Sequence, residues 1–290
     1  MKGFCPYVIT SPELFYAFLE EARNLRANTN ATRITLRFVT SPDYRLWLPT
    51  QPDGYYTSLE TTAIPLFGRW RGHRVQYFGE NSVQRIEPKD VIEKEHRIVF
   101  ESLSRANQRD PFLKPNQNGY QLQIGIGNDR DIKQLHELYN AVYRDYVFHL
   151  TLENVTELVE NPKSITATAR STDGRIASVA IAEVVEIPTN KGLLKISEIS
   201  DEATHPHHRG NGLNQACVHS LTRELIKTYG EEIHLIYAED RATSRGVNQQ
   251  SANLGWVYDG RLNRHCRIDA DRDIEVEGPH EDLNVWHFPR

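Results

Sequence analysis

The sequence has few cysteines and no long apolar run. Cys5, Cys217 and Cys266 are its only cysteines, and they form no C-x-x-C pair. An odd number at such wide spacing is typical of free thiols in a reducing compartment rather than of a disulfide framework. No apolar stretch approaches the roughly 20 residues that a membrane-spanning helix needs. We therefore expect a cytoplasmic protein without a membrane partner.

Positive charge is not in excess either. Lys and Arg number 34 against 39 for Asp and Glu, which gives a formal net charge of −5. A protein that binds duplexes needs basic side chains to neutralise phosphates, so we expect no nucleic-acid partner. The first twenty residues include Pro6, Pro12, Glu13 and Glu20, and thus lack the apolar core of a signal peptide.

What is present is the composition of a globular protein, with 39% hydrophobic and 25% charged residues. A length of 290 residues favours two domains. Two prolines, a glycine and several amide side chains interrupt the hydrophobic periodicity between residues 107 and 119. We predict an N-terminal α/β domain over residues 1–106, a linker over 107–119 and a second domain over 120–290.

Hydrophobic spacing predicts strands that first form hairpins and then alternate with helices. In the first domain a helix begins after Ser11, a good N-cap, with Pro12 at its first position, and a strand follows at 33–39. In the second domain we predict helices at 129–143, 152–160, 211–229 and 246–254, and strands at 120–126, 164–169, 176–185, 193–204, 233–238, 256–262 and 283–288. This order indicates an α/β fold, a mixed sheet with helices on both faces.

A glycine-containing loop lies between the strand at 193–204 and the helix that follows it. The segment reads SEISDEATHPHHRGNGL from Ser197 to Leu213. Glycines let the backbone approach an anion closely, and a helix N-terminus attracts phosphate. The loop is a tight turn without a ligand, a dinucleotide site whose third glycine is missing, or a coenzyme A pyrophosphate site. The last interpretation needs (Q/R)-x-x-G-x-(G/A), in which His207 replaces the usual Gln or Arg.

This loop resembles that of the GCN5-related N-acetyltransferase (GNAT) superfamily, and five blocks resemble the β-lysine N-acetyltransferases within it. The blocks are residues 198–204, 209–213, 241–248, 254–262 and 281–286. The resemblance covers about residues 120–290. It implies the GNAT fold, a mixed and mostly antiparallel sheet with helices on both faces, preceded here by the smaller N-terminal domain. One interpretation of that domain is a degenerate half of the same fold.

Acetyl transfer to an amine requires a neutral amine, so a carboxylate is needed as general base. The superfamily commonly places this group where Glu198 stands, and Asp201 is the second catalytic candidate. Strict alternation would send the two side chains to opposite faces of the strand. A bulge, usual in the superfamily, would bring both to the cleft, where Asp201 could instead hold the substrate ammonium. The alternative is that one of them is a solvated strand residue.

The resemblance implies acetyl-CoA as co-substrate, with backbone amides near Ala203 and Thr204 stabilising the oxyanion. The predicted cofactor contacts are Ala203, Thr204, His205, His208, Arg209, Gly210, Asn211, Gly212, Leu213 and Asn248. The tyrosine that often protonates the leaving thiolate is missing, since the expected place reads Gln250-Ser251-Ala252-Asn253. We consider Ser244 and Tyr258 as substitutes.

An amino-acid substrate also needs a partner for its carboxylate. Arg241 offers a guanidinium fork, although an unpaired surface arginine is the alternative. The further predicted substrate-binding residues are Tyr143, Ser244, Glu281 and Asn284. Three histidines, His205, His207 and His208, lie close together, but a metal needs converging ligands. We favour an anion site there and expect no metal.

These expectations combine into one function. The chain is predicted to transfer acetyl from acetyl-CoA to a primary amine of a small, β-lysine-like diamino acid by direct attack, as a monomer or homodimer. The same chemistry on lysine, ornithine, a polyamine or a natural-product amine is one alternative. A non-catalytic acyl-CoA-binding regulator is another, favoured by the missing tyrosine and by His207.

Overall fold

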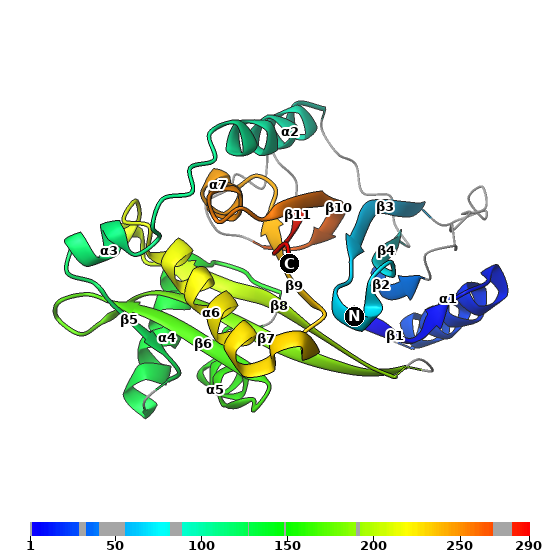
Figure 1. Ribbon diagram of the computed structural model, residues 1–290, viewed down its shortest axis with the longest axis horizontal. Coiled ribbons are helices and arrows are strands. Elements are labelled where there is room, and N and C mark those ends of the chain that lie inside the picture. Colours follow the sequence, from blue (N-terminus) through cyan, green and yellow to red (C-terminus); the bar gives the residue numbers. More distant parts are fainter. Residues whose placement is uncertain are drawn as a thin grey trace.

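The computed structural model describes residues 2–28, 33–40, 56–81, 89–126, 128–147, 149–189, 192–268 and 280–290. In this part the chain forms two β-sheets that lie against each other (Figure 1). The N-terminal sheet has the order β1-β2-β4-β3. Its strands are β1 (Lys2–Ile9), β2 (Arg33–Thr40), β3 (Tyr56–Pro65) and β4 (Arg74–Asn81).

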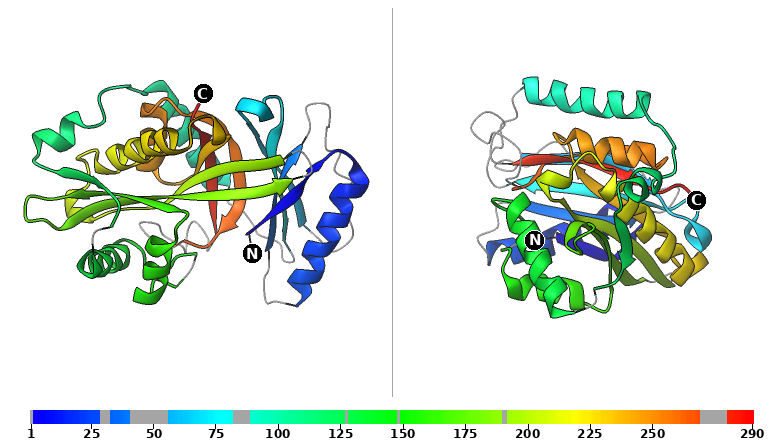
Figure 2. Two further views of the ribbon diagram at one scale, coloured as in Figure 1. Left: turned by 60° about the horizontal axis from the view of Figure 1, so that its bottom comes forward. Right: turned by 90° about the vertical axis from the view of Figure 1, so that its left-hand side faces the viewer.

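Helix α1 (Pro12–Ala27) covers the outer face of the N-terminal sheet (Figure 2). As predicted, Ser11 caps it by accepting a hydrogen bond from the Leu14 amide at 3.4 Å. Phe15 is fully buried and its ring contacts Phe38 and Phe78 at centroid distances of 5.3 Å each. Burying such a side chain contributes about 1.5–3 kcal/mol, which fixes the helix on the sheet.

The second sheet has seven strands in the order β10-β11-β9-β8-β7-β6-β5. Neighbours pair antiparallel, except β8 and β9, which are parallel. The strands are β5 (Gln121–Ile124), β6 (Ser164–Arg170), β7 (Ile176–Thr189), β8 (Gly192–Thr204), β9 (Leu235–Arg241), β10 (Val257–Cys266) and β11 (Glu281–His287). The predicted mixed, mostly antiparallel sheet is thereby confirmed.

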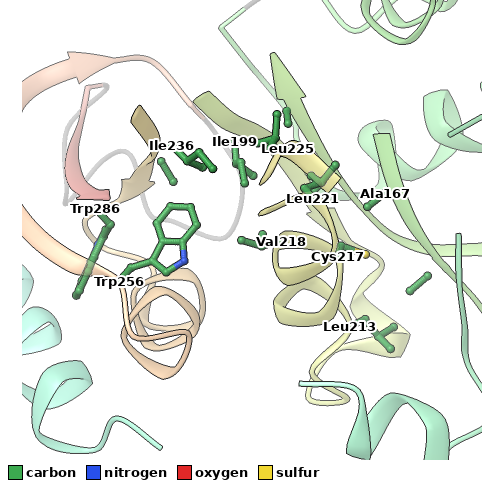
Figure 3. Packing of buried hydrophobic residues seen from close by; sticks show 14 of the residues in the cluster. Ala167, Ile199, Leu213, Cys217, Val218, Leu221, Leu225, Ile236, Trp256 and Trp286 are labelled. Carbon is green, nitrogen blue, oxygen red and sulfur yellow. The ribbon is translucent and has the colours of Figure 1, made fainter. Parts of the chain in front are cut away.

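Helices cover both faces of this sheet, as predicted (Figure 2). Helix α6 (Leu213–Tyr229) packs on one face. Helices α4 (Asp129–Val142) and α5 (Leu152–Glu160) pack on the other. Figure 3 shows Cys217, Leu221 and Leu225 of α6 directed into this core, with Trp256 and Trp286 at its far end. Burial raises the pKa of the Cys217 thiol, as befits a core residue rather than a nucleophile.

A further core joins the two sheets. Val39, Ile64 and Val75 of the N-terminal sheet are buried against Ile196 and Val285 of the larger one. Alternation explains the arrangement, because successive residues of β2 and β4 point to opposite faces. One face of the N-terminal sheet therefore receives α1, and the other packs on the second sheet.

Three elements differ from the sequence predictions. Strand β1 was not predicted, since Gly3 and Pro6 weaken the strand pattern of its sequence. Proline is tolerated in β1 because this strand lies at the edge of the sheet. Helix α2 (Lys89–Ser104) lies within the predicted first domain but packs on α7 (Arg245–Asn253). The predicted linker contains helix α3 (Leu113–Gln117), so residues 107–119 are not a bare connection.

Candidate functional site

Strands β8 and β9 separate where the site begins. They pair from Ile196 to Ile199 with Leu235 to Ala238, and the described residues form no pair beyond this point. In the same region β8 shifts register against β7, because Ser200 pairs with Ile181 and Ala203 with Val179. Two residues of β8 therefore oppose one of β7, which is the predicted bulge. Strands β8 and β9 thus open into a cleft, with one cavity on each side of the bulge in β8.

The first cavity, of about 700 Å³, adjoins the glycine loop. Gly210 and Gly212 have φ of 77° and 72°, values that side chains disfavour and glycine adopts freely. Gly212 is the N-cap of α6 and offers no side-chain cap, so the first amides of the helix remain available to an anion. Loop and helix end thus form a site suited to phosphate.

The segment before β5 supports this loop. Lys114 of α3 donates to the Gly210 carbonyl, and Asn118 Nδ2 donates to Asn211 Oδ1 at 2.8 Å. Tyr120 Oη lies 2.9 Å from His208 Nδ1. Residues 113–120 therefore help to fix the loop geometry.

The second cavity, of about 770 Å³, lies between the two sheets and is rich in charge. Its walls carry seven carboxylates and four arginines. The acidic residues are Asp145, Glu183, Glu198, Asp201, Glu202, Glu239 and Asp240, and the arginines are Arg33, Arg37, Arg241 and Arg267. Arg33 and Arg37 come from β2, so the N-terminal sheet supplies part of this wall.

Glu198 lines the second cavity and is held by two partners. Arg37 Nη1 lies 2.8 Å from Glu198 Oε2, and Tyr237 donates its hydroxyl hydrogen to the same oxygen at 2.9 Å. Arg37 also contacts Glu239 Oε1 at 3.8 Å, and Tyr77 donates to that oxygen at 3.0 Å. The guanidinium therefore balances two carboxylates at the junction of the sheets.

Asp201 lies in the bulge itself. Its φ is 51°, a left-handed conformation that Asp tolerates better than most residues. Its Oδ1 accepts a hydrogen bond from Tyr146 at 2.9 Å, and its Oδ2 accepts one from Ser200 at 3.1 Å. Because of the bulge, Asp201 and Glu198 face the same cavity, as the sequence analysis predicted.

Glu202 follows in the bulge and lines both cavities. Its Oε2 accepts hydrogen bonds from Asn214 of α6 and, at 2.9 Å, from Gln250 Nε2 of α7. Burial, and after it the charge of Asp240, raises the pKa of Glu202 to about 8. Burial likewise raises the pKa of Asp240, whose Oδ2 accepts a hydrogen bond from Ser251 at 2.6 Å.

Most predicted site residues line one of the two cavities. The first is lined by Thr204, His208, Arg209, Gly210, Asn211, Gly212, Leu213 and Ser244, and the second by Glu198 and Asp201. Tyr143 and Arg241 line both, and the Tyr143 hydroxyl donates to the Glu202 carbonyl. Burial raises the pKa of Tyr143 beyond its ordinary range.

Five predicted contacts lie elsewhere: Ala203, His205, Asn248, Glu281 and Asn284. Asn248 is fully buried; its Nδ2 donates to two carbonyls and its Oδ1 accepts from Asn284 at 2.7 Å. Glu281 is buried and its Oε2 accepts from Arg241 Nε at 2.9 Å. The side chains of Asn248 and Glu281 stabilise the walls of the cleft, because their polar atoms form hydrogen bonds inside the fold. Burial, then the nearby His207, lowers the pKa of His205.

The sequence analysis missed several residues of the site, above all Arg37, Glu202 and Asp240. A signal for Arg37 was available, since Arg33, Thr35 and Arg37 alternate with apolar residues and so share one strand face. We assigned that strand without giving its polar face a role. Among the described residues no group of three or more His, Cys, Asp or Glu side chains is placed to hold a metal ion. Of the helices that the structure describes, none has the length and apolar character to span a membrane.

Comparisons with known proteins agree with the motifs. No family model matches the chain. It is 30% identical over 156 residues to N-acetyltransferase YodP of Bacillus subtilis, covering 54% of this chain and 50% of the relative. It is 29% identical over 170 residues to a beta-lysine N(6)-acetyltransferase of Methanosarcina mazei, covering 58% and 55%.

The chain thus spans about half the length of the curated relatives that it matches. A solved structure of Arabidopsis thaliana NAA60 with acetyl-CoA is similar to this chain at a TM-score of 0.47. The two share 12% identity, and the match covers 58% of this chain and 97% of that one. The two curated relatives are both named as N-acetyltransferases. They confirm the resemblance of this chain to N-acetyltransferases, including a beta-lysine N-acetyltransferase, that its motifs predicted.

Proposed function

We propose that the chain is an acetyl-CoA-dependent N-acetyltransferase for a primary amine of a small diamino acid similar to β-lysine. One observation carries this proposal: the phosphate-suited cavity and the acidic cavity meet at the bulge of β8. Tyr143, Glu202, Arg241 and Val247 line both cavities. A molecule whose phosphates lie at the glycine loop can therefore present its other end to a ligand in the acidic cavity.

The first cavity suits coenzyme A. Its pyrophosphate would be held by the amides of residues 209–213 and by Arg209, and its pantetheine arm would pass Thr204. When bound, the acetyl thioester supplies an electrophilic carbonyl. Backbone amides of the splayed strand near Ala203 and Thr204 would donate to the oxyanion.

The second cavity suits a diamino acid. A ligand with two ammonium groups and one carboxylate carries more positive than negative charge. Besides Glu202 and Asp240, whose pKa values are raised by burial, the walls carry five carboxylates against four arginines. Arg33 and Arg241 are candidate partners of the ligand carboxylate. Asp201, fixed by Tyr146, is a candidate partner of an ammonium group. The β-lysine enzyme among the relatives supports this choice of substrate class.

Glu198 is the proposed general base. Its ion pair with Arg37 orients the carboxylate, and the side chain remains partly accessible at 14%. It accepts the proton that the acceptor amine must lose before attack.

Thiol release from acetyl-CoA, measured across β-lysine, lysine, ornithine, spermidine and a peptide N-terminus, tests the proposal. We expect turnover with a diamino acid. Glu198→Gln should lower turnover about 10²-fold or more while acetyl-CoA binding, measured by calorimetry, persists. Glu224→Gln, on the surface of α6, is the matched control and should match the parent.

Turnover of the peptide or the polyamine alone would overturn the substrate class. Unchanged turnover in Glu198→Gln would remove Glu198 from the mechanism. Binding of acetyl-CoA without turnover of any amine would instead favour the second candidate, an acyl-CoA-binding regulator. That candidate is supported by Ser251, which stands in the segment where a tyrosine acid is expected.

A further inference from the structure

The segment 250–253, which lacks the expected tyrosine, contains a serine that is hydrogen-bonded to a buried aspartate. Ser251 Oγ donates to Asp240 Oδ2 at 2.6 Å, and both residues are buried. The hydroxyl hydrogen of Ser251 is therefore engaged in a hydrogen bond inside the fold. The Tyr258 ring contacts the Trp286 ring at a centroid distance of 5.3 Å and an interplanar angle of 60°, and it lines neither cavity. Neither hydroxyl is placed to reach a leaving sulfur.

Glu202 occupies the position that a proton donor needs. It lies on the boundary of the two cavities, where the thioester of a bound coenzyme A would meet the acceptor amine. Both amide donors, Asn214 and Gln250, bind the same oxygen, Oε2. Within the described part of the chain, Oε1 has no hydrogen-bond partner. This geometry leaves Oε1 free to carry a proton toward the cleft.

The surroundings of Glu202 favour the protonated form at neutral pH. Burial is the main cause, and the neighbouring carboxylates add to it. The titratable side chains that interact with Glu202 include Asp201 of β8, Asp240 of β9, Tyr139 and Tyr143 of the α4 end, and Cys217 of α6. None of these is a cation. Arg241, which lines both cavities, is paired with the buried Glu281.

We propose that the Glu202 carboxyl is the general acid that protonates the departing coenzyme A sulfur, in place of the missing tyrosine. This inference rests on the proposed function. Glu198 first accepts a proton from the substrate ammonium and passes it to solvent. As the neutral amine nitrogen then bonds to the thioester carbon, Glu198 accepts the second proton from that nitrogen. When the carbon–sulfur bond breaks, its electron pair stays on sulfur and Glu202 transfers its proton there. Solvent returns a proton to Glu202, and the proton on Glu198 is released, so the cycle balances.

The test compares the parent protein with Glu202→Gln, which keeps the size of the side chain and removes the acid. We expect kcat to fall about 10²-fold. The parent should lose activity as pH rises through about 8, where Glu202 deprotonates, and the variant should lack this alkaline limb. With a selenoester analogue of acetyl-CoA, whose selenolate leaves without a proton, the kcat values of the parent and of Glu202→Gln should become similar.

Two further readouts do not depend on turnover. Coenzyme A binding by calorimetry should be nearly unchanged in Glu202→Gln. An infrared band of a protonated carboxyl at neutral pH should weaken in that variant and not in Glu224→Gln. Ser244→Ala, which removes the remaining candidate hydroxyl beside the first cavity, should retain the alkaline limb.

Each contrary result is distinct. An unchanged kcat or a retained alkaline limb in Glu202→Gln overturns the acid role, and so does a rate loss that the selenoester fails to restore. Lost coenzyme A binding in that variant would show a structural role instead. If the parent protein neither binds nor uses acetyl-CoA, the proposed function itself fails, which is a separate outcome.

Discussion

At the scale of single residues, the site depends on carboxylates kept in unequal environments. Glu198 is paired with an arginine, whereas Glu202 and Asp240 have only neutral donors among their described hydrogen-bond partners. The charge of Glu198 is thus compensated by Arg37, whereas burial disfavours the charged forms of Glu202 and Asp240.

Asp240 gives a prediction about stability. Burial raises its pKa, so the folded protein holds this proton more tightly than the unfolded chain does. Its contribution to the free energy of unfolding is therefore greatest at acid pH and is lost as pH rises through about 7. Asp240→Asn should raise Tm relative to the parent by about 2–4 °C at pH 8 and by less at pH 5. Calorimetry at both values checks this; a pH-independent difference would contradict it.

At the scale of elements, the sequence could predict most of the second domain but not its irregularities. The strand at 193–204 and the helix after the loop follow from hydrophobic spacing, and the structure has them as Gly192–Thr204 and Leu213–Tyr229. The bulge was expected only through the resemblance, because period-two alternation contains no signal for one extra residue. Helix α3 was not predicted because Pro115 and three polar residues leave its single turn without a hydrophobic pattern.

The bulge can be tested through Asp201. Asp201→Ala and Asp201→Gly both remove the hydrogen bond from Tyr146, but only the alanine keeps a Cβ at a φ of 51°. We expect the alanine variant to be less stable than the glycine variant by about 1 kcal/mol. Urea unfolding of the two proteins measures the difference. Equal stability would mean that residue 201 leaves the left-handed region.

At the scale of the whole molecule, the two sheets do not behave as separate bodies. Their shared core and the contact of Arg37 with Glu198 and Glu239 cross between them. The sequence predicted two domains, and packing of the first on the second as one interpretation, but none of the residues that join them, since contacts between distant segments leave no local periodicity. The N-terminal side of the acidic cavity was missed for the same reason.

This interface predicts one cooperative unfolding transition. Ile64→Ala removes a fully buried side chain from the shared core and should lower the free energy of unfolding by about 2–5 kcal/mol. Calorimetry should show the single transition moving to lower temperature. Val185→Ala, at a side chain that is 41% exposed, is the control and should change stability by about 0.5 kcal/mol or less. Two resolved transitions in the parent would refute the shared core.

The wall formed by β2 has a consequence for how such proteins diversify. Arg33, Thr35 and Arg37 line the acceptor cavity from a sheet that takes no part in the glycine loop. Under the proposed function, substitutions in that strand would change which amine enters while the loop that holds the acyl donor stays intact. Donor binding and acceptor choice would then be encoded on different stretches of the same chain.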